Sequence, residues 1–330
     1  MLNNDREVER KVLGILKVLS EASQPLGARI ISQQLESQGV YLTERAVRYH
    51  LQLLDERGLT TSDGREGRRI TKKGIEELSN ALVSDKVGLV INKIDTLSYL
   101  TTFDPSTGKG KIALNTSMFP AGEFDRAVEA MRPVFAARHC VSDLVAVAES
   151  GQMLGDIRVP EGHVGFGTVC SVTINGILLK AGIPVESKFG GVLQVRGSKP
   201  LRFTDLISYA GSSLDPLEVF IRSKMTNVLA AANGGEGKLL ASFREIPFVC
   251  QAAVEDLLAQ ISERRLGGLM ALGQPGNELL DVPVGANQVG MVIIGGLNPV
   301  AAVEEVGIRA VNRALSTMYD FEALRSFWEL

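Results

Sequence analysis

Residues 43–59 carry the groups in this sequence that are best suited to contacting a nucleic acid. The stretch, TERAVRYHLQLLDERGL, opens on a hydroxyl, places two arginines in the next six residues and then becomes rich in leucine. Arginine can bind a guanine edge through paired hydrogen bonds and discriminate that base by about 1–3 kcal/mol. We expect DNA contacts from these side chains: Thr43, Arg45, Arg48, Tyr49, His50 and Gln52. Tyr49 and His50 are equally compatible with half-buried packing.

A second basic group lies at residues 65–73, where five basic side chains accompany one acidic side chain. The basic side chains are Arg65, Arg68, Arg69, Lys72 and Lys73. The segment LTTSDGREGRRIT has β-prone ends around a glycine-rich turn, which is typical of a hairpin. The first eighty residues carry 13 basic and 12 acidic groups, so positive charge is concentrated in this hairpin. We interpret it as a wing that lies along DNA phosphates.

Three helices are expected to hold these two basic groups. A first helix is predicted by apolar residues at helical spacing, namely Val8, Val12, Ile15, Leu16 and Leu19. After a turn at Pro25, a second helix over ARIISQQLES is expected to stop at Gly39. In the third helix Thr43 is a suitable N-cap, and Val47, Leu51 and Leu54 share the buried face.

This order of elements predicts a winged helix-turn-helix over residues 1–82, with the third helix as the recognition helix. Two alternatives stay open. Winged helices also bind proteins, and the ITKKGIEEL end resembles winged domains attached to ribonucleases, which would favour RNA.

The chain beyond the polar segment SNALVSDK (79–86) contains an internal duplication. The matching segments, at offsets between 123 and 127 residues, are 108–120 with 235–247, 144–156 with 269–281, 159–162 with 282–285, and 165–183 with 290–308. The duplication predicts a regulatory domain at 86–330 built from two similar α/β lobes, roughly 86–205 and 206–318. The expected fold class is therefore α/β, and α+β overall once the winged helix is included. A cleft between such lobes is a common ligand position.

The two copies differ in polarity after the GFG turn. Copy one carries Thr168, Cys170, Ser171, Thr173 and Asn175 where copy two carries Ile293, Gly295, Gly296, Asn298 and Val300. Flexible glycines at 165 and 167 could bring backbone amides close to an anion, and small donors follow them. We therefore expect an effector site at Gly165, Gly167 and the five polar residues of copy one, with charge from Arg158 or His163. The alternative is that Gly165 and Gly167 allow close packing and the hydroxyls bond to backbone.

Composition and motifs exclude several classes of protein. The 35 basic and 38 acidic side chains give no long-range field toward nucleic acid or a membrane, so any DNA contact must be local. Three cysteines without a C-x-x-C pair, and a charged N-terminus without a signal peptide, predict a cytoplasmic protein. No apolar run is long enough to span a membrane, and three scattered histidines argue against a metal site.

Catalytic motifs are also lacking. The segment NGGEGKL resembles a phosphate-binding loop but has Ala232 and Leu239 at positions where that motif needs glycine and a hydroxyl residue. Neither G-x-S-x-G nor H-E-x-x-H occurs, so we expect no enzyme activity and no cofactor.

Taken together, the winged helix ending RRITKKGIEEL and the stretches VPEGHVGFGTVCSVTINGILLKAGIP and GMVIIGGLNPVAAVEEVGI resemble the NrpR family. This family consists of archaeal transcriptional repressors of nitrogen-assimilation genes. The resemblance implies a homodimer that binds a palindromic double-stranded DNA operator and is released by 2-oxoglutarate. Some family members carry two regulatory domains and others divide the work between two proteins. The single regulatory domain here therefore leaves room for a second NrpR-type chain, or the transcription machinery, as a partner.

Three hypotheses follow from these observations. The first is the ligand-controlled repressor. The second is a co-regulator that bridges another DNA-bound protein through its winged helix. The third is an enzyme of unknown activity tethered by the winged helix, which the lobe cleft alone supports.

Overall fold

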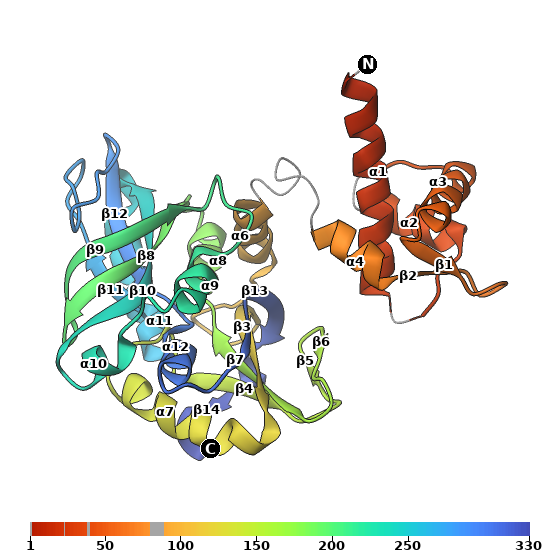
Figure 1. The fold of residues 1–330 in the computed structure, drawn as a ribbon. Helices are drawn as coiled ribbons and strands as arrows, with labels where there is room; N and C mark the ends of the chain where they lie inside the picture. Colours follow the sequence, from red (N-terminus) through yellow and green to blue (C-terminus); the bar gives the residue numbers. More distant parts are fainter. Residues whose placement is uncertain (1, 23, 38–39, 80–88) are drawn as a thin grey trace. The chain divides into compact units, whose positions relative to one another are not determined.

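The computed structural model describes residues 2–22, 24–37, 40–79 and 89–330 (Figure 1). The chain divides into two compact units, Met1–Lys86 and Val87–Leu330, called here the N-terminal unit and the C-terminal unit. The boundaries predicted at 82 and 86 lie in residues 80–88, outside the described residues. Gly39 and the side chain of Val8 are also outside them.

The N-terminal unit has the elements of a winged helix. Its helices and strands are α1 (Leu2–Glu21), α2 (Ala28–Ser37), α3 (Glu44–Glu56), β1 (Thr60–Ser62), β2 (Arg68–Ile70) and α4 (Lys72–Ser79). Strands β1 and β2 form the antiparallel wing, and Leu26 bridges to Arg68 beside it. Gly67 is required at the base of this wing, because a Cβ there would lie within 2.8 Å of the backbone of Gly27 and φ is +126°.

A small apolar core fixes the orientation of α3. The Thr43 hydroxyl accepts a hydrogen bond from the amide of Ala46 at 3.2 Å and begins the helix. Val47, Leu51 and Leu54 are buried against the apolar residues of α1 and α2. The opposite face of α3 is consequently left for contacts outside the unit.

The C-terminal unit contains two five-stranded sheets flanked by helices (Figure 1). Its helices are α6 (Leu89–Leu100), α7 (Phe124–Ala136), α8 (Val172–Lys180), α9 (Pro216–Arg222), α10 (Val228–Ala232), α11 (Gln251–Glu263) and α12 (Asn298–Glu305), with short 3₁₀ turns at Ala121–Glu123, Phe248–Cys250, Phe321–Ala323 and Phe327–Glu329. Its strands are β3 (Lys111–Pro120), β4 (Leu144–Ala148), β5 (Met153–Leu154), β6 (Ile157–Arg158), β7 (His163–Val169), β8 (Glu186–Arg196), β9 (Lys199–Ser208), β10 (Glu236–Pro247), β11 (Leu269–Leu272), β12 (Gln288–Ile294), β13 (Val311–Asp320) and β14 (Arg325–Ser326). The predicted fold class, a winged helix followed by a mixed domain with two sheets, is confirmed.

Four strands of each sheet repeat one order, β13-β3-β7-β4 and β8-β10-β12-β11, and one strand of each four comes from the other copy. The fifth strands differ, since β14 lies beyond β4 and β9 lies beyond β8, so the full orders are β13-β3-β7-β4-β14 and β11-β12-β10-β8-β9. Strand β8 follows the helix of copy one but pairs with β10 of copy two, and β13 follows the helix of copy two but pairs with β3 of copy one. The lobe boundary predicted near residue 205 does not coincide with a boundary between the sheets, because backbone pairing carries β8 and β9 into the second sheet and β13 and β14 into the first.

Equivalent hydrogen bonds tie each helix to its own copy. Thr173, in the first turn of α8, bonds through its hydroxyl to the amide and carbonyl of Ala113 on β3, at 3.1 and 3.2 Å. Asn298, at the same place in α12, bonds through its side chain to the amide and carbonyl of Leu240 on β10, at 2.8 and 3.0 Å. The alignment of these two residues in the sequence is thus matched by the same contact in space.

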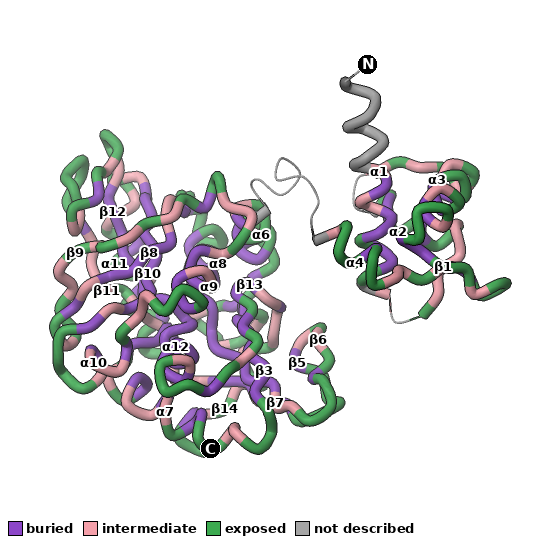
Figure 2. The backbone as a smooth tube through the Cα atoms, in the orientation of Figure 1, coloured by how far each residue is buried: buried purple, intermediate pink, exposed green. Residues whose placement is uncertain are grey.

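Apolar side chains fill the interior of the C-terminal unit. Figure 2 marks most residues of its central strands as buried. Strand β10 is buried over most of its length, and so are β3, β7 and β12. Within the described ranges, no helix is both long enough and apolar enough to cross a lipid bilayer.

Candidate functional site

Helix α3 presents most of the predicted DNA-contacting side chains on its exposed face. Arg45, Tyr49 and Gln52 are exposed, with Tyr49 at 61%. Arg48 is also exposed but forms an ion pair with Glu44, one turn earlier. The hydroxyl of Thr43 is used as the helix cap, so its clearest role is to position the helix.

His50 does not lie on this face, which corrects its assignment to the contact surface. It is only 7% exposed, because position 50 is three residues after Val47 and four before Leu54, on the core side of the helix. Burial, followed by the charge of Lys11, lowers the pKa of His50. Its ring meets Tyr49 edge to face, with centroids 5.6 Å apart.

The five basic residues predicted for the wing fall into two groups, and two of them, Lys72 and Lys73, begin helix α4 rather than lying in the wing. Arg68 donates to Asp55 at 2.7 Å, and Arg69 donates to Asp63 at 2.5 Å. Lys73 donates to the carbonyl of Arg57 at 2.8 Å. Arg65 and Lys72 are exposed and have no partner among the described residues, so their charges are free for phosphates.

Sequence reasoning missed Asp55, which joins the wing to the recognition helix. One of its carboxylate oxygens accepts from Thr60 on β1 at 2.6 Å and the other from Arg68 on β2. Asp55 and Arg68 are 26% and 31% exposed, so their ion pair is partly shielded from water. The sequence carried no distinctive signal for this role, since Asp55 is one of three acidic residues in the segment 43–59.

The glycines and one hydroxyl of the predicted effector segment have packing roles. A Cβ on Gly165 would lie 2.7 Å from Val159, and one on Gly167 would lie 2.9 Å from Leu114. Thr173 is committed to the backbone of β3. At these positions the structure agrees with the packing alternative rather than with direct contact to a ligand.

The predicted effector residues do not form one group, so that pocket is corrected. Arg158 is exposed on β6, and His163 begins β7 with its ring against the carbonyl of Glu161. Thr168 lies five residues along the extended strand β7 from His163, about 17 Å away at roughly 3.3 Å per residue, and Ser171 follows the end of that strand. The strand therefore separates His163 from the polar residues that it was expected to complete.

Arg244 of β10 reaches Ser171 instead. Its guanidinium donates to the carbonyl of Ser171 at 3.0 Å and to the hydroxyl at 2.8 Å. The side chain is 1% exposed, and its Nε has no hydrogen-bond partner among the residues that the structure describes. Burial lowers the pKa of Arg244 to about 10.

A small cavity of about 10 Å³ surrounds this contact. Residues from both copies line it: Ile94, Asn115, Cys170, Ser171, Val172, Ser187, Tyr209, Asp215, Leu217, Arg244, Gly296, Ala314 and Leu315. Burial raises the pKa of the Cys170 thiol to about 11, so it is protonated at neutral pH. Two further atoms of the predicted set, the Thr168 hydroxyl and the Asn175 carbonyl oxygen, are buried without partners; the Asn175 amide nitrogen donates to Ser187 at 2.9 Å.

Sequence reasoning also missed Arg244, because the second copy had been treated as stripped of polar groups. A signal was present in LLASFREIP, where two charged residues, Arg244 and Glu245, interrupt a run that is typical of a buried strand. Charged side chains are rarely buried without a specific role.

A larger and more open pocket, about 470 Å³, lies between the loops that follow α7 and α11. Arg138 and Arg265 occupy equivalent places in the two copies, and both have positive φ, +56° and +62°. Arg265 is held by Asp143 through two hydrogen bonds of 2.8 and 2.6 Å.

Across the part of the chain that the structure describes, no cluster of side chains suits a metal ion.

Comparisons with known proteins cover both units. Residues 87–326 match the family described as NrpR regulatory domains NRD1 and 2, and residues 13–78 match the Ribonuclease R winged-helix domain. Among solved structures, a nitrogen repressor-like protein from Methanococcus jannaschii is similar, with a TM-score of 0.61 and 28% identity. That match covers 73% of this chain and 98% of the other.

Curated relatives extend the similarity along nearly the whole chain. Global nitrogen regulator NrpRI from Methanosarcina mazei is 39% identical, over 97% of this chain and 99% of that protein. Proteins called Global nitrogen regulator NrpR, from Methanococcus maripaludis and Methanocaldococcus jannaschii, are 35% and 34% identical over 94% and 91% of this chain. This chain spans about half the length of those two, 54% and 52%.

Proposed function

The chain belongs to the NrpR family, and we propose that it is a DNA-binding transcriptional repressor of nitrogen-assimilation genes. One observation carries the proposal: the similarity to named global nitrogen regulators runs through both units, including the unit with the exposed recognition helix. Since these relatives are named as regulators, we propose no catalytic role. A DNA-binding protein of this kind would act in the cytoplasm.

The proposed DNA interface consists of the exposed face of α3 and two exposed cations, Arg65 in the wing and Lys72 at the start of α4. Arg45, Tyr49 and Gln52 would face base edges in the major groove, and Arg65 and Lys72 would contact phosphates. We propose that the chain acts as a homodimer on a palindromic operator, because two such helices read half-sites about one helical turn apart. A second NrpR-type chain is a further candidate partner, since two relatives are about twice as long.

We propose 2-oxoglutarate as the effector that releases the protein from DNA. A dicarboxylate needs separated anion contacts made by cations, hydroxyls and amides. Release requires the effector to bind more tightly to a form that holds DNA poorly, with a typical coupling of about 1–3 kcal/mol.

Fluorescence anisotropy tests this function. A labelled duplex from the promoter of a nitrogen-assimilation gene would be titrated with the full chain, with and without 2-oxoglutarate, and with succinate as a control. We expect binding that 2-oxoglutarate weakens and succinate does not. Failure of the chain to bind DNA by itself would favour the co-regulator, and binding that ignores 2-oxoglutarate would exclude it as the effector.

A further inference from the structure

We propose that the guanidinium of Arg244, together with the hydroxyls of Ser171 and Tyr209, receives one carboxylate of an anionic effector inside the C-terminal unit. The cavity at this position is closed by helix α9 in the structure. The inference rests on the effector-controlled function proposed above and assigns it a site.

The first argument is the missing counter-charge of Arg244. A buried charge is normally paired, because removing it from water costs several kcal/mol. No ion pair joins Arg244 to any carboxylate in the described ranges, and its Nε is unsatisfied. Only one carboxyl group, that of Asp215, lines the same cavity. An arriving carboxylate would supply both the charge and the acceptor that Arg244 lacks.

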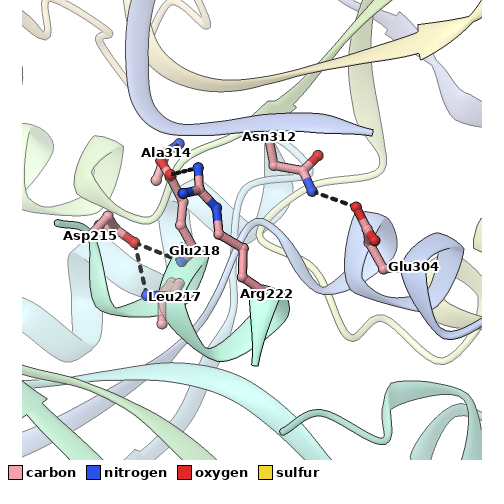
Figure 3. Close-up of polar contacts among 7 residues, drawn as sticks. All are labelled: Asp215, Leu217, Glu218, Arg222, Glu304, Asn312 and Ala314. Carbon is pink, nitrogen blue, oxygen red and sulfur yellow. Dashed lines mark hydrogen bonds and ion pairs between the residues drawn. The ribbon is translucent and has the colours of Figure 1, made fainter. Parts of the chain in front are cut away.

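Asp215 does not fill this role, because its side chain is already engaged. Its Oδ1 accepts from the amides of Leu217 and Glu218, at 2.9 and 3.3 Å, and caps α9 (Figure 3). Burial and the nearby Glu218 carboxylate raise the pKa of Asp215 to about 7. Near neutral pH the Asp215 carboxyl group is therefore only partly ionised.

The second argument is the donor set around the cavity. Tyr209 lies on the cavity wall, is 4% exposed, and its hydroxyl makes no hydrogen bond to the residues described. Ser171 turns its hydroxyl toward Arg244 from the start of α8. One cation, one unused hydroxyl and one shared hydroxyl match the acceptor sites of a single carboxylate.

The third argument is the way the cavity is closed. At about 10 Å³ it has room for roughly one water molecule, so a carboxylate ligand requires it to open. Leu217 of α9 and Ala314 of β13 form part of its wall. These elements are held together by Glu218, which accepts from the amide of Ala314 at 2.6 Å and pairs with Arg222 at 3.3 Å (Figure 3). We call this contact between Glu218 and Ala314 the α9 clasp.

The cavity is also lined by α6, the helix that follows the DNA-binding unit in the sequence. Ile94 of α6 lines the cavity, and α6 packs against α8, whose first residues hold Ser171. The packing is close, since a Cβ on Gly176 of α8 would lie 2.7 Å from the carbonyl of Ser98 on α6. A ligand that expands the cavity would therefore press on Ile94 of α6, the helix that follows the DNA-binding unit in the sequence.

Calorimetry with 2-oxoglutarate and the full chain tests the site. Arg244→Gln should weaken binding at least 10-fold, because it removes charge-assisted hydrogen bonds. Arg138→Gln, in the larger pocket, is the matched control and should bind as the wild type does. If the wild type binds and Arg244→Gln binds equally, the inference is overturned while the proposed function stands. If Arg138→Gln alone loses binding, the larger pocket is the site. A wild type that binds no 2-oxoglutarate overturns both the effector and its site.

Two further variants keep the inference testable if Arg244→Gln does not fold. Tyr209→Phe removes only the unused hydroxyl, so folding should be kept and affinity should fall at least three-fold; unchanged affinity overturns the assignment. Glu218→Ala releases the α9 clasp and should raise the affinity for 2-oxoglutarate. Glu129→Ala, which breaks an exposed pair with Arg132, is its control. Equal affinity in the two glutamate variants would refute closure by α9.

Discussion

Two arginines of the wing, three residues apart, should respond differently to the same substitution. Arg65 is exposed and has no partner among the described residues, whereas Arg68 is held by Asp55. Each phosphate contact adds about 0.9 to the slope of log affinity against log salt. Between 50 and 200 mM salt, a fourfold change, one contact therefore accounts for about a 3.5-fold difference in affinity. In a dimer the contact is made twice, and the two contacts together account for about a 12-fold difference in affinity over the same salt range.

Arg65→Ala should reduce the slope of log affinity against log salt by about 0.9 for each protomer, or about 1.8 for a dimer, without changing the free energy of unfolding. Arg68→Ala should leave the slope nearly unchanged and lower the free energy of unfolding of the N-terminal unit by about 1 kcal/mol, since its ion pair is only partly shielded. Anisotropy with a duplex of random sequence at several salt concentrations measures the slope, and urea denaturation measures stability. An unchanged slope for Arg65→Ala would show that the wing does not lie on phosphates.

Two further predictions concern the C-terminal unit. Asn298→Leu removes three buried hydrogen bonds and leaves an amide of β10 unpaired, so urea denaturation should show a loss of about 2 kcal/mol or more. Asp215, with its pKa raised to about 7, keeps a proton in the folded chain that the unfolded chain loses near the ordinary pKa of 3.8. Stability should therefore fall as pH rises from about 4 to 7 and level off above that, and Asp215→Asn should flatten this part of the profile; an unchanged profile would contradict the assignment.

The local features of this fold could be predicted from sequence because they depend on neighbouring residues. The capped third helix and the hairpin with Asp63 and Gly64 follow from helical spacing and turn chemistry, and both are present. The alignment of the two copies placed Thr173 opposite Asn298, and both make the same bond to a strand. His50 was the exception on α3, since its position at the edge of the apolar stripe left its burial open.

Non-local contacts could not be predicted in the same way. Which sheet receives β8 or β13 depends on which strand edge is free after the helices have packed, and no local pattern records that choice. Arg244 and Ser171 lie 73 positions apart in the chain and meet only because the two copies interlock. The predicted effector residues, chosen for nearness in sequence, are instead spread over β6, β7, the turn that follows β7, and α8.

The exchange of β8 and β13 has a consequence for how the C-terminal unit holds together. A fragment that stopped after β9 would keep β3 but lack β13, and it would keep β8 but lack β10. Both orphaned strands would then expose rows of unpaired amides and carbonyls, which invite aggregation. Because each half depends on a strand from the other, we expect the duplicated unit to unfold in a single cooperative transition.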